Sequence, residues 1–217
     1  MYIVERPLTI LVGVIKRFGP SRVKQVLWDR EFSGGHWDFI DCTAGDCVYS
    51  HLESNLNHGT ILDLGCGPGN TATELSADSY RLYVGVDISQ SALDKALRRS
   101  EESGRASKNR FVRSDFLSYV PSERFDVILI REAMYHVPQS KVKSMLHHYS
   151  EYLTNNGVFV VRVSTIALNG KVKRRLQMMV SLIEREFNVV EKRQYDKSGP
   201  LVITFRPRGS VGQRTLD

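Results

Sequence analysis

Apolar and polar positions alternate in a regular way through residues 58–206. Short apolar runs typical of buried strands are separated by segments in which apolar residues recur every three or four positions, as in amphipathic helices. The apolar runs lie near residues 61–64, 82–86, 110–113, 125–130 and 157–163. This alternation predicts a doubly wound α/β domain built on a mostly parallel sheet.

Two helical faces and a hairpin are expected in the last third of the chain. The faces comprise Val142, Met145, Leu146, Tyr149 and Leu153 in one helix, and Val172, Leu176, Met179, Val180, Ile183 and Phe187 in the next. Two further extended runs, 188–195 and 201–206, flank a turn-rich link at 196–200 and predict an antiparallel hairpin. The expected sheet therefore has seven strands.

The first 57 residues do not follow this alternation, and they predict an N-terminal helical cap. Pro7 and Pro20 both suit the first turn of a helix. Aromatic residues then gather beside the flexible pair Gly34 and Gly35, and they include Trp28, Phe32 and Trp37. These rings can pack as core between the cap and the sheet, or they can cover a bound ligand as a lid.

Residues 61–70, ILDLGCGPGN, run an apolar strand into a glycine loop and predict a nucleoside-binding site. Glycines at alternate positions let the backbone turn tightly and approach a ligand before a helix that begins near Asn70. A dinucleotide fingerprint has a third glycine where this chain has Asn70, and Pro68 lacks the N–H that a pyrophosphate site uses. A ligand without pyrophosphate therefore fits better.

Polar residues also follow the next three strands, at the edge where open α/β sheets bind ligands. Asp87 ends the second strand about 20 residues beyond the loop, where a ribose-binding carboxylate is expected. Asp115 and Phe116 follow the third strand, where a carboxylate can accept from an adenine amino group and a ring can cover the base. The fourth strand ends at residues 131–136, REAMYH.

In this ordered set of motifs, residues 55–206 resemble the class I S-adenosylmethionine-dependent methyltransferases, which have a Rossmann-like sheet. The resemblance implies S-adenosylmethionine as the cofactor. The cofactor-binding residues that the resemblance and the strand ends imply are Asp63, Gly65, Cys66, Gly67 and Gly69 near the methionine end, Asp87 and Ile88 at the ribose, Ser114, Asp115 and Phe116 at the adenine, and the Arg131 backbone. Residues 28–39 also resemble a bacterial subset found with polysaccharide-building glycosyltransferases.

Composition agrees with one domain over residues 1–217, divided into a cap (1–57), a core (58–206) and a basic tail (207–217) for which disorder is expected. The chain is 41% hydrophobic and 25% charged, close to the average of globular proteins. Its three cysteines show no metal-binding spacing, and their odd number argues against a disulfide framework, so we expect no metal and a reducing cytoplasm. The apolar run at residues 8–15 is too short to span a bilayer.

The net charge of +6 raises the question of whether the protein binds nucleic acid, but the excess basic residues are mostly scattered along the chain. Local concentrations lie at residues 16–24, 171–175 and 206–214, and no basic run is interleaved with aromatics as in a nucleic-acid-binding module. Solvated faces explain these groups more simply than phosphate binding does. Nucleic acid is therefore not the expected partner.

The chemistry implied is an in-line displacement, in which alignment of the acceptor and the methyl group supplies most of the catalysis. A hydroxyl acceptor must also lose a proton, and His136 is the candidate base, with Glu132 or Tyr135 as orienting neighbours. A purely structural role for His136 remains open. Candidate acceptor contacts are Trp28, Phe32, Trp37 and Tyr135.

Motifs that are absent from the sequence narrow the range of possible methyl acceptors. The end of the fourth strand lacks the Asp/Asn-Pro-Pro-aromatic run that is typical of methyltransferases acting on the amino groups of bases. It also lacks the cysteine that cytosine-C5 enzymes have near this position, and it lacks the paired glutamates of arginine methyltransferases. A small molecule or glycan precursor methylated on oxygen is the resulting hypothesis. An RNA-directed methyltransferase and a cofactor-binding module without turnover remain as alternatives. The sequence does not indicate the oligomeric state.

Overall fold

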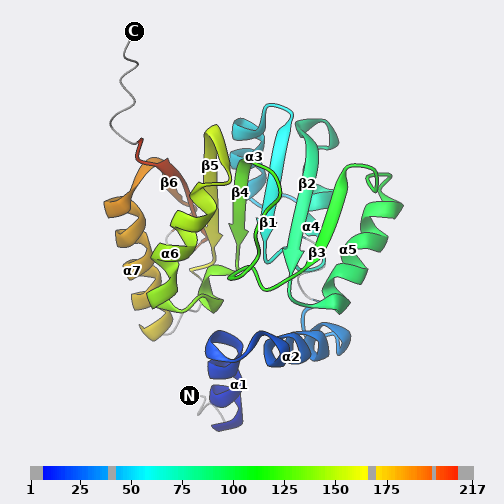
Figure 1. The fold of residues 1–217 in the computed structure, drawn as a ribbon, viewed down its shortest axis with the longest axis vertical. Helices are drawn as coiled ribbons and strands as arrows, with labels where there is room; N and C mark the ends of the chain where they lie inside the picture. The colour runs from blue at the N-terminus through cyan, green and yellow to red at the C-terminus, as the bar shows by residue number, and fades with distance from the viewer. Residues whose placement is uncertain (1–6, 39–42, 166–169, 197–198, 210–217) are drawn as a thin grey trace.

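The computed structural model describes residues 7–38, 43–165, 170–196 and 199–209, and it contains one seven-stranded sheet (Figure 1). The strand order is β3-β2-β1-β4-β5-β7-β6. The strands are β1 (Gly59–Leu64), β2 (Tyr80–Asp87), β3 (Asn109–Arg113), β4 (Phe125–Arg131), β5 (Leu153–Val163), β6 (Phe187–Gln194) and β7 (Leu201–Pro207). The first five are parallel, and β7 runs antiparallel to both β5 and β6, which confirms the expected fold.

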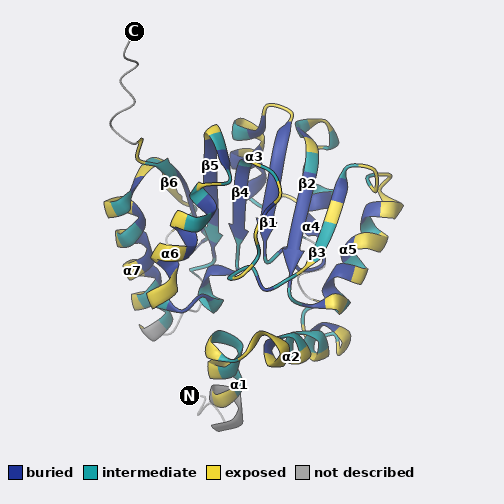
Figure 2. Ribbon diagram, viewed as in Figure 1, coloured by how far each residue is buried: buried dark blue, intermediate teal, exposed yellow. Residues whose placement is uncertain are grey.

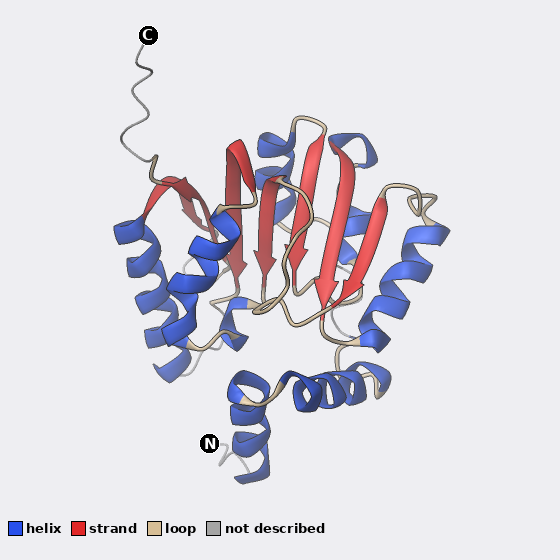
Figure 3. Ribbon diagram, in the orientation of Figure 1, coloured by secondary structure: helices blue, strands red, loops and turns tan. Residues whose placement is uncertain are grey.

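Helices cover both faces of the sheet (Figure 3). They are α3 (Val48–Leu56), α4 (Asn70–Glu74) and α5 (Gln90–Glu102) on one face, and α6 (Gln139–Ser150) and α7 (Gly170–Glu186) on the other. Successive strand residues point to opposite faces, so Ile61 packs with the first group while Leu62 and Leu64 pack with the second. Because both faces are covered, the central strands are buried along their length (Figure 2).

Two residues assigned to helical faces by the sequence pattern are instead the first residues of strands. Leu153 begins β5 three residues after the end of α6 at Ser150, and Phe187 begins β6 directly after the end of α7 at Glu186. Both side chains are buried in the same apolar cluster as the preceding helix. The three-to-four-residue spacing of apolar side chains therefore continues past the end of each helix, because the next apolar side chain is buried in the same cluster. The backbone at that residue already has the conformation of a strand.

The N-terminal region divides into two parts. Helices α1 (Pro7–Phe18) and α2 (Ser21–Ser33) lie beyond the carboxyl ends of the strands, outside the two helical layers (Figure 1). Helix α3, which the sequence pattern placed in the cap, instead packs on the sheet through Leu52 and Leu56. We therefore restrict the term cap to α1 and α2.

Polar contacts join the cap to the core. Asp29 of α2 accepts hydrogen bonds from the Ser89 hydroxyl at 2.9 Å and the Ser91 N–H at 3.1 Å, and it pairs with Arg113 at 2.9 Å. Lys24 of α2 forms a buried ion pair with a carboxylate beyond β3. The cap is thus tied to the loops that follow β2 and β3.

The expected basic tail, 207–217, lies mostly outside the described residues. Strand β7 reaches Pro207, at the first position of that tail. Within the described ranges, every helix is too short or too polar to cross a membrane.

The third glycine of the loop allows close packing of α4 against α5. Gly69 has φ of +76°, and a Cβ at this position would lie 2.7 Å from the Ala96 Cβ and 3.0 Å from its Cα. Gly69→Ala should therefore lower the free energy of unfolding by about 2–4 kcal/mol, through left-handed strain plus overpacking. Chemical denaturation measures this change.

Gly104→Ala is the matched control, because Gly104 has φ of +69° and no neighbouring atom within 4 Å of the place that a Cβ would take. This substitution should cost only the strain of the left-handed backbone, about 1–2 kcal/mol. Equal losses in the two variants would contradict the packing role of Gly69.

Candidate active site

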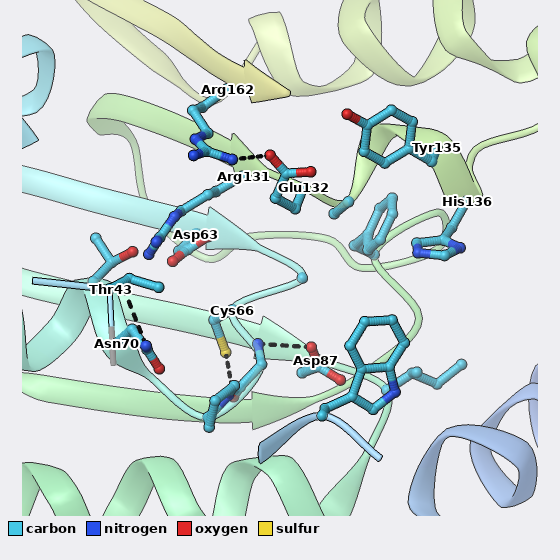
Figure 4. A pocket seen from close by; sticks show the side chains of 18 of the residues that line it. Thr43, Asp63, Cys66, Asn70, Asp87, Arg131, Glu132, Tyr135, His136 and Arg162 are labelled. Carbon is cyan, nitrogen blue, oxygen red and sulfur yellow. Dashed lines mark hydrogen bonds and ion pairs between the residues drawn. The ribbon is translucent and has the colours of Figure 1, made fainter. Parts of the chain in front are cut away.

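A cavity of about 580 Å³ opens between the carboxyl ends of β1, β2 and β4 and the cap (Figure 4). It lies where doubly wound sheets bind ligands, at the point where the strand order reverses between β1 and β4. Its lining includes these residues expected from the sequence: Asp63, Gly65, Cys66, Gly67, Asp87, Ile88, Phe116, Arg131, Tyr135, His136, Trp28, Phe32 and Trp37. The cavity thus brings most of the expected cofactor and acceptor residues together.

The glycine loop forms one wall and is held by the end of β2. The N–H groups of Gly65 and Cys66 donate to the Val86 carbonyl at 2.8 and 3.1 Å. Gly65 has φ of +82°, and a Cβ there would lie 2.7 Å from the Ala133 Cβ. Only glycine allows the loop to pass this close to the chain beyond β4.

Asp87 is the buried carboxylate at the base of this loop. Its Oδ2 accepts from the Gly67 N–H and its Oδ1 from the Ser89 N–H, both at 2.9 Å. Burial raises the pKa of Asp87, and the backbone N–H donors oppose that rise. Each carboxylate oxygen can accept a further hydrogen bond, so Asp87 is suited to bind vicinal hydroxyl groups.

Asp63, at the end of β1, has unused hydrogen-bonding capacity. Its Oδ2 accepts from the Tyr83 hydroxyl at 2.6 Å. Its Oδ1 is buried and has no hydrogen-bond partner among the described residues. Burial, partly offset by the Tyr83 hydrogen bond, raises the pKa of Asp63 to about 6. A buried carboxylate oxygen of this kind fits a ligand that brings its own donor, such as an ammonium group.

Arg131 contributes its side chain to the cavity as well as its backbone (Figure 4). Its guanidinium donates to Asp46 at 2.9 Å and to the Tyr49 hydroxyl at 3.2 Å. Arg162 of β5 lies 3.2 Å from the same Asp46 carboxylate and also pairs with Glu132. Two cations and two carboxylates therefore form a charged network at this end of the cavity.

Most of this network could not be predicted from the sequence. Asp46 lies in a loop without a recognisable motif, and Arg162 lies inside an apolar strand run. Thr43 and Asn70 also line the cavity, and the Asn70 amide donates to the Thr43 hydroxyl at 3.1 Å. Only the polar residue within an otherwise apolar strand, Arg162, could have been noticed from the sequence.

Three expected cofactor residues, Gly69, Ser114 and Asp115, are not among those that line the cavity. The Asp115 Oδ2 is instead occupied by the Lys24 ammonium and by the Ser21 hydroxyl at 2.9 Å. Burial alone would raise the pKa of Asp115, but the Lys24 hydrogen bond and charge hold it below its usual value. Asp115 therefore joins the cap to the core, whereas Phe116 reaches the cavity.

The wall facing the glycine loop is aromatic. The Trp28 ring lies 6.3 Å from Phe32 and 5.7 Å from Trp37, measured between ring centroids. His136 meets the Trp28 ring edge to face at 4.8 Å. All three rings line the cavity, where Phe32 is buried and Trp28 and Trp37 are half-buried. The cap aromatics therefore pack against one another and line the cavity.

His136 follows a sharp change in chain direction beyond β4. Glu132 has φ of +55°, a left-handed conformation that is costly for a residue other than glycine, and the short helix η3 (Met134–His136) begins two residues later. Glu132 pairs with Arg162, and the Tyr135 hydroxyl donates to the Ser164 carbonyl. Both expected orienting neighbours therefore have other partners, and the Trp28 contact positions the imidazole instead.

The imidazole of His136 is neutral at physiological pH. Burial lowers its pKa to about 4, and the nearby charges of Lys16 and Arg17 add to this effect. A neutral imidazole can accept a proton from a group bound in the cavity. The cap also contains a histidine, His36, which is exposed and lies outside the cavity lining.

Comparison with known proteins identifies the domain. A family model described as a methyltransferase domain matches residues 61–157. Thiocyanate methyltransferase 1 of Brassica oleracea is 35% identical over 118 residues, which cover 52% of this chain and 50% of that protein. Ubiquinone biosynthesis O-methyltransferase of Rickettsia canadensis is 27% identical over 144 residues, covering 65% and 59%. The chain thus spans about half the length of the curated relatives it matches.

Solved structures share the fold. The N-methyltransferase NodS from Bradyrhizobium japonicum WM9, in complex with S-adenosyl-L-homocysteine, superposes with a TM-score of 0.66 at 18% identity. The superposition covers 85% of this chain and 98% of NodS. Together with the domain match, the shared fold confirms the resemblance found in the sequence. Residues 61–157 are thus similar to a methyltransferase domain, and the described chain has the fold of the S-adenosylmethionine-dependent class I methyltransferases.

Proposed function

We propose that this protein transfers a methyl group from S-adenosylmethionine to a hydroxyl of a small molecule or glycan precursor. The observation that carries the proposal is one cavity that has the Asp87 carboxylate and glycine loop on one side and His136 with the aromatic cap on the other. A cofactor and an acceptor can both contact this cavity. Calorimetric titration with S-adenosylmethionine, followed by a radiolabelled methyl-transfer assay against hydroxyl acceptors, tests the proposal.

The residues of the cavity fit the cofactor in four ways. Asp87 offers two carboxylate oxygens to ribose hydroxyls, and the unpartnered Asp63 oxygen suits an ammonium group. The Arg131 guanidinium suits a carboxylate, although Asp46 already neutralises part of its charge. Ile88 and Phe116 offer apolar cover for a base. When bound, S-adenosylmethionine supplies an electrophilic methyl group on a sulfonium centre.

The protein then has two tasks at the acceptor side. The half-buried rings of Trp28 and Trp37 exclude water and hold the acceptor in line with the methyl group. His136 is deprotonated at neutral pH and accepts the proton that the acceptor hydroxyl loses. Oxygen is the proposed acceptor atom because a neutral amine would not need a base at this position.

The two alternatives give different results in the same experiments. A cofactor-binding module without turnover would bind S-adenosylmethionine and methylate none of the acceptors. An RNA-directed enzyme would bind RNA with an affinity that falls steeply with salt concentration, because counterions are released on binding. Salt-insensitive turnover of a small hydroxyl acceptor supports the proposal.

Asp87→Ala should weaken S-adenosylmethionine binding by about 1–3 kcal/mol, through loss of charge-assisted hydrogen bonds. Calorimetry measures the affinity. Asp94→Ala is a suitable control, because Asp94 is exposed on α5 and outside the cavity lining. Unchanged affinity in Asp87→Ala would contradict the assignment of the ribose-binding carboxylate.

His136→Gln should lower turnover by about 100-fold, at the lower end of general-base effects because a pKa near 4 makes a weak base. Affinity for S-adenosylmethionine should change little, so kinetics and calorimetry are measured together. Equal losses of turnover and cofactor affinity would instead assign His136 to binding.

The lowered pKa of His136 also predicts a pH dependence of stability. Between pH 6.5 and about 4 the unfolded chain binds the proton more readily, so the free energy of unfolding falls as the pH falls through this window. Partial solvent access limits the loss to roughly 1–3 kcal/mol. Denaturant unfolding at pH 7, 6 and 5 should show this loss in the wild type and a smaller one in His136→Gln. Parallel pH curves would contradict the shifted pKa.

A further inference from the structure

Two arginines from opposite ends of the chain meet beside His136. The Arg17 guanidinium, on α1, donates to the Tyr135 carbonyl at 3.0 Å. The Arg175 guanidinium, on α7, donates to the same carbonyl at 3.2 Å and to the Val137 carbonyl at 3.0 Å. The two cations therefore share one acceptor on the segment that carries the proposed base.

These arginines differ from other cations near the cavity, which are paired with carboxylates. The pairs are Lys16 with Glu31, Lys24 with Asp115, Arg131 with Asp46, and Arg162 with Glu132. Within the part of the chain that the structure describes, neither Arg17 nor Arg175 forms an ion pair with a carboxylate. Carbonyl oxygens bind guanidinium groups without neutralising their charge.

The Arg17 side chain also has a donor that is not used. Its Nε is buried and has no hydrogen-bond partner among the described residues. Burial lowers the pKa of both arginines, and the charge of Arg175 lowers the pKa of Arg17 further. Two like charges held together in a partly buried position favour an anion between them.

The arginine pair lies next to the acceptor side of the cavity. Tyr135, whose carbonyl both arginines contact, lines the main cavity, and Arg175 and Tyr135 also line a small adjoining pocket. Helix α1 and the start of α7 both lie toward the carboxyl ends of the strands (Figure 1). A group bound by the arginines would therefore be close to His136.

We propose that Arg17 and Arg175 bind an anionic group of the methyl acceptor, and that this group is a phosphate ester. The proposal rests on the methyl-transfer function proposed above and names the class of its acceptor. Planar guanidinium donors match phosphate oxygens in geometry and charge. The phosphate can belong to a soluble sugar phosphate or to a lipid-linked precursor, which present the same chemistry.

Binding of the anion would also act on His136. The charged groups that face this imidazole are Lys16, Arg17 and Arg175, which lower its pKa, and Glu31, which raises it. A phosphate between the two arginines offsets their charge, so the pKa of His136 rises toward neutrality. A base with a pKa closer to the working pH is more effective, so the correct acceptor would improve its own deprotonation.

Phosphate binding to the full chain tests the proposal directly. Inorganic phosphate and pyrophosphate are titrated into the protein saturated with S-adenosylhomocysteine, and calorimetry measures the affinity. Arg17→Gln and Arg175→Gln should each weaken pyrophosphate binding at least tenfold. Arg174→Gln and Arg22→Gln are matched controls, because both arginines are exposed and both variants should bind as the wild type does. Equal weakening in all four variants, or no saturable binding to the wild type, would overturn the proposal.

A second measurement uses the wild-type protein, so its outcome does not depend on whether the variants fold. The His136 imidazole is titrated by NMR with and without phosphate at constant ionic strength. Phosphate should raise its pKa by about one unit, whereas chloride at the same ionic strength should not. An unchanged pKa at saturating phosphate would overturn the proposal. Affinity for S-adenosylhomocysteine is measured separately, so loss of cofactor binding, which contradicts the proposed function, is distinguishable from loss of the anion site.

Competition then distinguishes the two sources of phosphate. Glucose 1-phosphate represents a soluble ester, and vesicles of phosphatidylglycerol with phosphatidylcholine represent a lipid surface. Displacement of pyrophosphate by the soluble ester alone supports a soluble acceptor, and displacement by the vesicles supports a lipid-linked one. Displacement by neither probe, at concentrations well above that of pyrophosphate, would overturn the assignment to phosphate esters.

Discussion

The buried carboxylate of Asp87 is the constraint on which the rest of the site depends. A charge at the end of β2 with so little access to water must be satisfied by hydrogen bonds, and the donors available are the N–H groups of Gly67 and Ser89. Satisfying it fixes the glycine loop against the sheet and begins the turn into α5. Positive φ at Gly65, Gly67 and Gly69 is the backbone geometry that makes this arrangement possible. Cofactor-binding capacity is therefore built into the same interactions that fold the strand ends.

Other carboxylates around the cavity face the same requirement and meet it differently. Asp46 is saturated by two guanidinium groups, and Asp115 is saturated by Lys24, Ser21 and a backbone N–H. Asp63 alone among these three keeps a buried oxygen without a partner in the described chain. Saturated carboxylates join elements of the fold, whereas carboxylates with remaining capacity mark positions for a ligand. Identical residue types at successive strand ends thus have different roles, decided by the partners that the fold brings to them.

Those partners explain which features the sequence could predict. The strands, the glycine loop and Asp87 follow from local patterns, because each depends on residues within one strand or on a nearby strand end. The pairing of Asp115 with Lys24, 91 positions earlier, could not be predicted from the motif that follows β3. The charged network of Arg131 could not be predicted either, since Asp46 lies 85 positions away without a motif. Long-range pairing of charges carries no periodic signal, so spacing along the chain does not reveal it.

Attachment of the cap depends on this same long-range pairing more than on apolar burial. Along α2, Phe32 is the buried apolar residue, and the firm contacts to the core are those of Lys24 and Asp29. Asp29 directly follows Trp28 in the chain, and it binds Ser89, two residues beyond Asp87. The aromatic wall that meets His136 is therefore positioned by the segment that also holds the buried Asp87 carboxylate. Because Asp29 and Trp28 are adjacent in α2, the position of the loop that follows β2 determines the position of the Trp28 ring beside His136.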